Sequence, residues 1–377
     1  MGTIPRLNFT ACTVKQGFDS SFLLLHSAPT VNGAKPLKPA KPRLLVVELW
    51  DMGDLVIATP FLRAACEKFS VTLVCKPAWK DLQARFWPEV HVVPFVAPWT
   101  TFTGKYQLHR WPWLEFLRLR KEIGRGQFDV GLSMHAGGDP RDHFLLALAR
   151  VKERLGFPRL GSQVFLTRPL QRPDPASHRF EYWRVLGEAL GINLPPREKI
   201  FPSNPVSNGN EILIHTGAKQ SVRVWPLERY RSLTMKLRNK NYRVQIACNP
   251  DQQQWWQQAG EKNVVVPKTV IELLEVVDRA AVFIGNDSGP GHLAAMAGVP
   301  TFTLFGPQLS EWFAPLHPGA EWIEGKPCPY KPCSDYCFFP SPHCLQTITE
   351  EEVWRRVEPF VAREFARRSA NLRAALT

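Results

Sequence analysis

The amino-acid sequence predicts an α/β protein of two similar halves. Its 377 residues exceed what one hydrophobic core usually contains. Short apolar runs typical of buried strands alternate with helical patterns, which indicates parallel sheets. This alternation stops at the proline-rich residues 193–210 and then starts again. We therefore expect two facing Rossmann-like domains with a central cleft, and sites at the carboxyl ends of their strands.

The pattern divides the chain into four parts. Residues 1–41 form an N-terminal extension that lacks sustained periodicity and ends in "NGAKPLKPAKP", which is typical of a flexible tether. The first domain is expected over 42–200 and the second over 201–349. Residues 350–377 read as a C-terminal helix, a candidate to pack back on the first domain.

Both domains repeat the same order of elements. In the first, the expected strands are "RLLVVELW", "VTLVC", "VHVVPF" and "FDVGLSM", and the helices are "LVIATPFLRAACEKF", "AWKDLQARF", "DHFLLALAR" and "RFEYWRVLGEAL". In the second, the strands are "EILIH", "YRVQIAC", "AVFIG" and "TFTLFG", and the helices are "LERYRSLTMKLRN", "VIELLEVVDRA" and "HLAAMAG".

Net charge and the length of apolar runs limit the classes of partner and the location that we expect for the protein. The formal net charge of +13 favours anionic partners such as nucleic acid, nucleotide substrates or an acidic membrane surface. No apolar run approaches the roughly 18 residues of a membrane-spanning helix, and "SFLLLH" is too short and poorly flanked for a signal peptide. We expect a cytoplasmic protein.

The stretch "GNDSGPGHLAAMAGVP" at 285–300 places a polar turn between a strand and a small-residue helix. Pro290 suits a first helical position, and Ser288 and Gly289 leave backbone N–H groups free. These donors and the helix dipole form an anion site that fits a diphosphate. The alternative is an ordinary helix cap by Asp287 or Ser288.

Two other turns carry charged residues. The loop "HTGAKQSVRVWP" brings Arg223 toward the same diphosphate, unless that arginine is merely a solvated surface residue. In "DMGDLVIATP", Gly53 supplies the expected turn and Asp54 opens a helix, where it is either a general base or a cap. This turn lacks G-x-G-x-x-G, which argues against a dinucleotide-dependent dehydrogenase.

These segments, above all "FIGNDSGPGHLAAMAGVPTFTLFGP", resemble glycosyltransferase family 9, the bacterial ADP-heptose:lipopolysaccharide heptosyltransferases, over about residues 43–360. The resemblance implies a GT-B fold and inverting, metal-independent transfer of a heptose to a lipopolysaccharide-core or similar glycan acceptor. It implies an enzyme at the inner face of the inner membrane. By position it makes Asp54 the base, and it places the donor on Thr216, Gly217, Arg223, Asp287, Ser288, Gly289 and His292.

The sequence departs from the family pattern in two places. Arg223 stands where a lysine is usual, so the cation is kept. After "YRVQIAC" a glutamate that holds the ribose is usual, whereas this chain reads "NPDQQQ" and offers Asp251 or Gln252. The base and the sugar of the donor are therefore left open.

A late cysteine cluster has the pattern C-x4-C-x3-C-x6-C. Four soft ligands in a short loop could hold a structural zinc ion, although paired C-x2-C spacing is absent and an uncoordinated loop is the alternative. No cofactor is expected to be required for catalysis. The four residues are Cys328, Cys333, Cys337 and Cys344.

The acceptor side is marked less clearly. The segment 99–122 interleaves aromatic and basic residues, which suits an anionic lipid surface or a phosphorylated acceptor. A plain packed amphipathic helix is the alternative, and nucleic acid is not the expected partner. "SMHAGGDPRD" follows a strand, so His135, Asp139 and Arg141 are acceptor-side candidates. Gly53, next to Asp54, is the fourth.

Two other functions fit part of the pattern. A nucleotide-sugar epimerase of GT-B-like fold would share the nucleotide site. A non-catalytic glycan- or nucleotide-binding protein would bind donor without turnover, and Asp54 would then be only a cap. Release of free nucleoside diphosphate only when acceptor is present distinguishes transfer from both.

Overall fold

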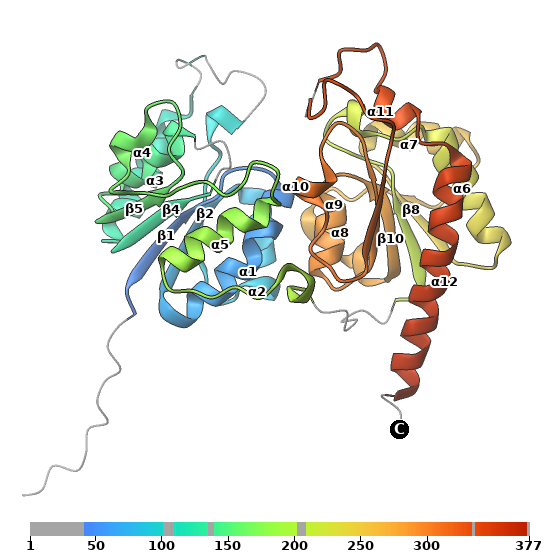
Figure 1. Ribbon diagram of the computed structural model, residues 1–377, viewed down its shortest axis with the longest axis horizontal. Coiled ribbons are helices and arrows are strands. Elements are labelled where there is room, and N and C mark those ends of the chain that lie inside the picture. The colour runs from blue at the N-terminus through green and yellow to red at the C-terminus, as the bar shows by residue number, and fades with distance from the viewer. Residues whose placement is uncertain are drawn as a thin grey trace, which may run out of the picture. The chain divides into compact units, whose positions relative to one another are not determined.

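The computed structural model describes residues 41–100, 107, 109, 111–134, 139–201, 209–333 and 336–374, except the side chains of 372 and 374. The chain divides into two units, Met1–Ala40 and Lys41–Thr377, and the described residues all belong to the second. The predicted extension thus lies almost wholly outside the described residues. The second unit contains two six-stranded parallel sheets with helices, which confirms the predicted fold class (Figure 1).

The first sheet has the strand order β3-β2-β1-β4-β5-β6, the order of Rossmann folds. Its central strand, β1, is buried along Leu44–Val47 because helices cover both faces of a parallel sheet. The strands are β1 (Arg43–Val47), β2 (Ser70–Cys75), β3 (His91–Pro94), β4 (Val130–Ser133), β5 (Glu153–Gly156) and β6 (Arg168–Pro169). The helices are α1 (Met52–Lys68), α2 (Gln83–Phe86), α3 (Trp113–Arg125), α4 (Pro140–Leu148) and α5 (Arg179–Ala189).

The second sheet repeats this topology, with the order β12-β11-β10-β7-β8-β9. Its strands are β7 (Glu211–His215), β8 (Val244–Ala247), β9 (Val264–Val265), β10 (Ala280–Asn286), β11 (Thr301–Phe305) and β12 (Ala320–Glu324). Its helices are α6 (Leu227–Asn239), α7 (Gln253–Gln258), α8 (Val270–Asp278), α9 (Gly289–Met296), α10 (Ser310–Phe313), α11 (His343–Gln346) and α12 (Glu350–Ala374).

The long C-terminal helix α12 packs against α6 and β10, beside the second sheet (Figure 1). The expectation that it packs back on the first domain is therefore wrong. Its apolar residues Val353, Val357 and Phe360 are fully buried in the core of the second half, and the ring of Phe360 lies 5.6 Å from that of Phe302. The apolar face of α12 is thus buried against the second half, which directly precedes the helix in the sequence.

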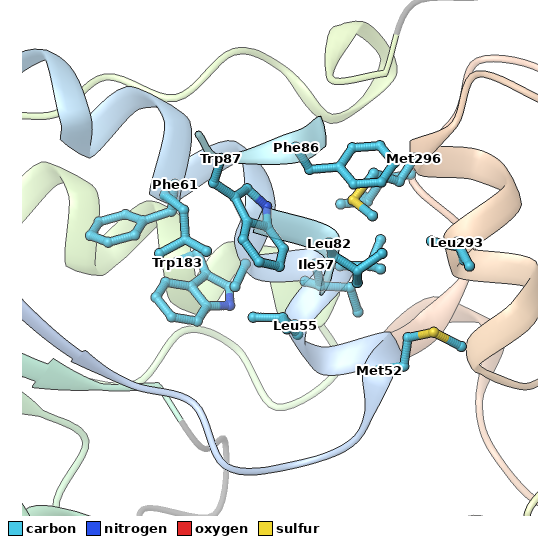
Figure 2. Packing of buried hydrophobic residues seen from close by; sticks show 14 of the residues in the cluster. Met52, Leu55, Ile57, Phe61, Leu82, Phe86, Trp87, Trp183, Leu293 and Met296 are labelled. Carbon is cyan, nitrogen blue, oxygen red and sulfur yellow. The ribbon is translucent and has the colours of Figure 1, made fainter. Parts of the chain in front are cut away.

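Helices α1 and α9 join the two halves. Figure 2 shows Met52 and Ile57 of α1 in one apolar cluster with Leu293 and Met296 of α9. Each buried side chain of this size contributes about 1.5–3 kcal/mol relative to exposure. The hydroxyl of Thr59 also lies 3.3 Å from the sulfur of Met296. This contact sets the N-terminus of α1, with Asp54, beside that of α9.

Within the described part of the chain, no helix combines the length and apolar character needed to cross a membrane.

Candidate active site

The two polar loops of the second half meet because their strands are neighbours. β7 and β10 pair in parallel, with His215 opposite Gly285, so the segments that follow them emerge together. Buried Asn286 links the two loops. Its Oδ1 accepts hydrogen bonds from the backbone N–H of Trp225 and the hydroxyl of Tyr230, both at 2.9 Å, and its Nδ2 donates to the carbonyl of Thr216 at 2.8 Å. The side chain of Asn286 therefore ties the two loops together through three hydrogen bonds.

Thr216 belongs to this supporting network. Its side chain is fully buried, and its hydroxyl donates to Gln252 Oε1 at 2.8 Å and accepts from Trp256 Nε1 at 3.2 Å. Thr216 therefore helps to hold the loop in place, and its contact with the donor stays a prediction. Gly217 is required by a close approach, because a Cβ there would lie 2.1 Å from Asn249 Oδ1.

Helix α9 begins one residue before Pro290, the predicted first position, with Ser288 as its N-cap and Gly289 as its first residue. The side chain missing from Gly289 makes room for Met52, whose Cε would lie 2.6 Å from a Cβ there. Gly53 lies inside α1 instead of in a turn, and a Cβ on it would lie 3.0 Å from His292 Cδ2. Both glycines thus allow the two helix N-termini to approach closely.

Arg223 and Asp287 come together beside α9. A short 3-10 turn, Ser221–Arg223, ends at the arginine, and its Nη1 lies 3.7 Å from Asp287 Oδ2. The side chain of Asp287 is nearly buried, whereas that of Arg223 remains 21% exposed. His292 is also buried, its Nδ1 has no hydrogen-bond partner among the described residues, and burial and the charge of Arg223 lower its pKa to about 4. His292 is therefore neutral at physiological pH.

Asp54 is half-buried at the start of α1, where its Oδ2 accepts a hydrogen bond from the backbone N–H of Asp51 at 3.2 Å. It therefore does form part of a cap. Burial, and then the charge of Asp51, raise its pKa to about 6, against the opposing effects of the Asp51 N–H, Lys76 and Arg223. A carboxylate with a pKa this close to neutrality suits a general base. Asp54 can both cap α1 and act as a base, since the hydrogen bond from Asp51 uses only one of its two carboxylate oxygens.

Asp51 bridges the halves. Lys76 Nζ lies 2.8 Å from its Oδ1, and Lys219 Nζ of the second half lies 2.9 Å from its Oδ2. Burial acts to raise the pKa of Asp51, but the charges and hydrogen bonds of these lysines hold it below its ordinary value. Asp51 is thus an ion-pair residue, in contrast to Asp54.

Sequence patterns missed a buried acid, Glu48, just after β1. Its Oε1 accepts from the backbone N–H of Trp50 at 3.1 Å. Burial and the charge of Asp54 raise the pKa of Glu48 well above its usual range. Glu48 therefore holds its proton more tightly than an exposed glutamate does. The signal in the sequence was a single glutamate at the end of an apolar run.

The structure does not bring all of the acceptor-side candidates together. His135 lies outside the described residues. Asp139 caps α4 through the backbone N–H of Arg141 at 2.9 Å, and its Oδ2 lies 2.7 Å from Arg141 Nη2. The guanidinium of Arg141 also lies over Trp99, 5.6 Å from the ring centre. Asp139 and Arg141 thus form a pair of their own, and Gly53 is the candidate beside Asp54.

A pocket of about 660 Å³ opens next to these loops in the second half. Of the two candidates for the ribose, Asp251 is exposed and lines this pocket. Gln252 also borders it, but its side-chain amide is bonded to Thr216. Half-buried Trp255 adds an aromatic surface. The pocket has the size and the mixed character of a nucleotide site.

The described residues of the cysteine loop are not arranged as a metal-ligand set. No group of three or more His, Cys, Asp or Glu residues in the described ranges is placed to hold a metal ion. Cys328, Cys333 and Cys337 are half-buried free thiols, and Cys344 is buried. The structural zinc ion stays a prediction.

Comparisons with known proteins show the family and the fold. The family model described as glycosyltransferase family 9 (heptosyltransferase) matches residues 116–337. Lipopolysaccharide heptosyltransferase 3 of Escherichia coli (strain K12) is 29% identical over 104 residues, which span 25% of this chain and 30% of that protein. This alignment thus covers less than a third of the curated relative.

Solved structures show the fold. E. coli heptosyltransferase WaaC with ADP has a TM-score of 0.67 at 17% identity, covering 84% of this chain and 99% of that one. With ADP-2-deoxy-2-fluoro heptose the same protein gives 0.62 at 16%, with the same coverage. A family 9 glycosyl transferase from Veillonella parvula DSM 2008 gives 0.69 at 20%, covering 87% and 100%. The fold is GT-B. Since the family model spans more than half of its length, the chain belongs to glycosyltransferase family 9.

Proposed function

We propose that the protein transfers a heptose from ADP-heptose to a lipopolysaccharide-core or similar surface-glycan acceptor, with inversion at the anomeric carbon. The observation that carries the proposal is the meeting of a base and an anion site: the contact between α1 and α9 sets Asp54 beside the α9 N-terminus and Arg223. Family membership supports the reaction class. The ADP and fluoro-heptose complexes of WaaC support the donor.

In the proposed step, Asp54 takes the proton of the acceptor hydroxyl as that oxygen attacks the anomeric carbon. The bond from that carbon to the diphosphate oxygen breaks, and ADP leaves with the electron pair. The leaving charge develops toward Arg223 and the free N–H groups at the start of α9. These positive groups perform the task that a divalent metal has in other transferases, so we propose that none is needed.

The reaction can be tested with ADP-heptose and lipopolysaccharide from a heptose-deficient strain. We expect ADP release that requires the acceptor, together with a heptosylated product seen by mass spectrometry. A changed sugar without acceptor would instead indicate the epimerase. Donor binding without turnover on any acceptor would indicate the binding protein.

The pocket of the second half is proposed to hold the ADP moiety, with Asp251 at the ribose and Trp255 against the base. Base-aromatic stacking is worth about 1–3 kcal/mol, so Trp255→Ala should weaken ADP binding about 5- to 100-fold by calorimetry. Trp354→Ala, which removes a half-buried indole of α12, is the matched control. Equal affinities for both variants would exclude Trp255 from the base site.

Helix α3 supports association with an anionic membrane surface. Its buried residues Leu119 and Ile123 face the core, whereas Trp113, Leu114 and Leu117 are 50%, 72% and 58% exposed. Exposed apolar side chains mixed with basic ones are typical of helices that lie in the lipid interface. Part of the predicted segment 99–122 lies outside the described residues. The exposed basic residues of the helix are Arg118, Arg120, Lys121 and Arg125.

Flotation with acidic liposomes should recover the protein at low salt and lose it at high salt, because screening weakens attraction to anionic lipids. Leu114→Glu with Leu117→Glu should abolish recovery. Met235→Glu with Ile271→Glu, which adds the same charge at exposed apolar positions of the second half, should not. Equal recovery with neutral liposomes would contradict the electrostatic part, and equal effects of both double variants would contradict the role of α3.

A further inference from the structure

Arg179, the first residue of α5, lies beside the candidate base. Helices α1 and α5 run side by side: the rings of Phe61 and Trp183 are 5.0 Å apart, and Lys68 Nζ donates to the carbonyl of Gly191. Following the two helices back from these contacts by four residues brings Arg179 level with Ile57, in the N-terminal half of α1 that also carries Asp54. Consistent with this, the charge of Asp54 acts on Arg179.

The guanidinium of Arg179 is held by rings. It lies 4.0 Å from the ring centre of Trp312, 5.5 Å from that of Phe313 and 5.6 Å from that of Tyr182, and its Nη1 donates a long hydrogen bond of 3.5 Å to the Tyr182 hydroxyl. Among the described residues, no carboxylate lies within ion-pair distance of it. By contrast, Arg184 on the same helix pairs with Glu181 at 2.8 Å.

The backbone around Arg179 is anchored to the second half. His178 Nδ1 accepts from the backbone N–H of Phe180 at 3.0 Å, so its Nε2 carries the proton and donates to the carbonyl of Ala314 at 2.9 Å. Burial, and then the charge of Arg197, lower the pKa of His178 to about 3, so this neutral tautomer persists at physiological pH. Arg179 is therefore fixed in place, and within the described part of the chain its five N–H donors make only the long hydrogen bond to Tyr182.

We propose that Arg179 binds an anionic group, a carboxylate or a phosphate, on the acceptor. The inference rests on the proposed transfer and names a feature of its acceptor. A stacked guanidinium without a carboxylate partner presents a rigid fork that matches either oxyanion. Arg179 belongs to α5 of the first half, although two of the rings that hold it, Trp312 and Phe313, belong to the second half. It is assigned to the acceptor because the proposed diphosphate site uses α9 and the Arg223 loop instead.

The anion would also affect the base. Arg179 is a positive neighbour of Asp54, and a positive neighbour favours the ionised carboxylate. An acceptor anion that neutralises Arg179 therefore raises the pKa of Asp54 and makes it a stronger base when the correct acceptor is bound. Arg179→Gln should shift the acidic limb of the kcat/KM profile to higher pH, because that profile reports the free enzyme.

The experiment compares the wild type, Arg179→Gln, Arg179→Lys and the control Arg168→Gln. Arg168 is an exposed arginine of β6 that pairs with Glu153 of β5. The acceptor probe is heptose-deficient lipopolysaccharide, used intact, after phosphate removal with hydrofluoric acid, or after reduction of its carboxyl groups. KM and kcat are measured with ADP-heptose. Acceptor binding to the ADP-saturated enzyme is measured by calorimetry, which does not require turnover.

With intact acceptor, Arg179→Gln should raise KM and the dissociation constant about 10- to 100-fold, and Arg179→Lys less, while ADP affinity and Arg168→Gln stay at the wild-type level. The acceptor treatment that abolishes this difference identifies phosphate or carboxylate. Wild-type turnover with no effect of Arg179→Gln, or weakened ADP binding, would overturn the inference and leave the proposed function standing. Binding that depends on Arg179 without turnover would support the inference and overturn the function. Wild type that neither binds nor turns over would overturn both.

Discussion

Replacing Asp54 by asparagine should lower kcat by roughly 10²- to 10⁴-fold, the usual worth of a general base, while ADP affinity stays unchanged. Asparagine keeps the size of the side chain, and its Oδ1 can still accept the hydrogen bond from the backbone N–H of Asp51. The variant therefore separates basicity from capping. Kinetics with saturating ADP-heptose and calorimetry with ADP provide the two measurements.

The pH dependence follows from the raised pKa of Asp54. A base must be ionised, so wild-type turnover should rise with pH through about 6, and Asp54→Asn should lack this limb. The sign for stability is opposite. Because the folded state binds this proton more tightly than the unfolded chain, ionisation of Asp54 costs folding free energy as pH rises from about 4 to about 6. The melting temperature of Asp54→Asn at pH 8 should therefore equal or slightly exceed that of the wild type.

Asp51→Asn is the matched control, three residues earlier at the N-cap of the same helix. The pKa of Asp51 is lowered instead of raised, and its oxygens pair with Lys76 and Lys219. Its loss should cost ion-pair stability and should keep an acidic limb, but at lower pH, because the charge of Asp51 no longer raises the pKa of Asp54. Full turnover by Asp54→Asn, or inactivity caused only by unfolding, would mean that Asp54 is a cap alone. Asp139, the carboxylate among the acceptor-side candidates, is already paired with Arg141.

The fold was predictable where apolar runs are long enough to show a period. β1, β7 and β10 are buried over their apolar stretches and were expected from sequence. The edge strands β6 and β9 were not, because two residues each carry no periodicity. The partner of α12 was also mistaken, since an amphipathic helix shows that it needs an apolar surface but not which one.

The candidate site was predictable where one turn carries it. Ser288 is the N-cap of α9 and Asp54 lies in the first turn of α1, because capping and turn chemistry are local. The exact starts differ from the expected ones, since α1 begins at Met52 and α9 at Gly289. The roles of Gly53 and Gly289 were not predictable, since the side chain that needs the space of each comes from the other half of the chain. Glu48 and Arg179 were missed for the same reason: their importance comes from burial and from rings that only the tertiary fold supplies.

The second large effect is expected at Arg223. Arg223→Ala should lower kcat by about 10²- to 10³-fold, the cost of removing one group that stabilises developing negative charge. It should also weaken ADP binding about 10- to 100-fold, the worth of a charge-assisted hydrogen bond. Arg223→Lys keeps the charge but loses the fork, so its defects should be smaller. Arg238→Ala controls for the loss of a positive charge, because it removes an arginine of α6 that pairs with Glu261.

The pH profile makes the Arg223 prediction specific. Arg223 lies 3.7 Å from Asp287 and lowers the pKa of Asp54, so it acts on both the donor side and the base. Without it, the acidic limb of the turnover profile should move to higher pH, and that of Arg223→Lys should move less. Arg223→Ala also leaves nearly buried Asp287 with less compensation, so its melting temperature must be measured beside the kinetics. A folded variant with unchanged ADP affinity, unchanged kcat and an unmoved limb would remove Arg223 from the site, and Lys219 of the same loop would then be the cation to test.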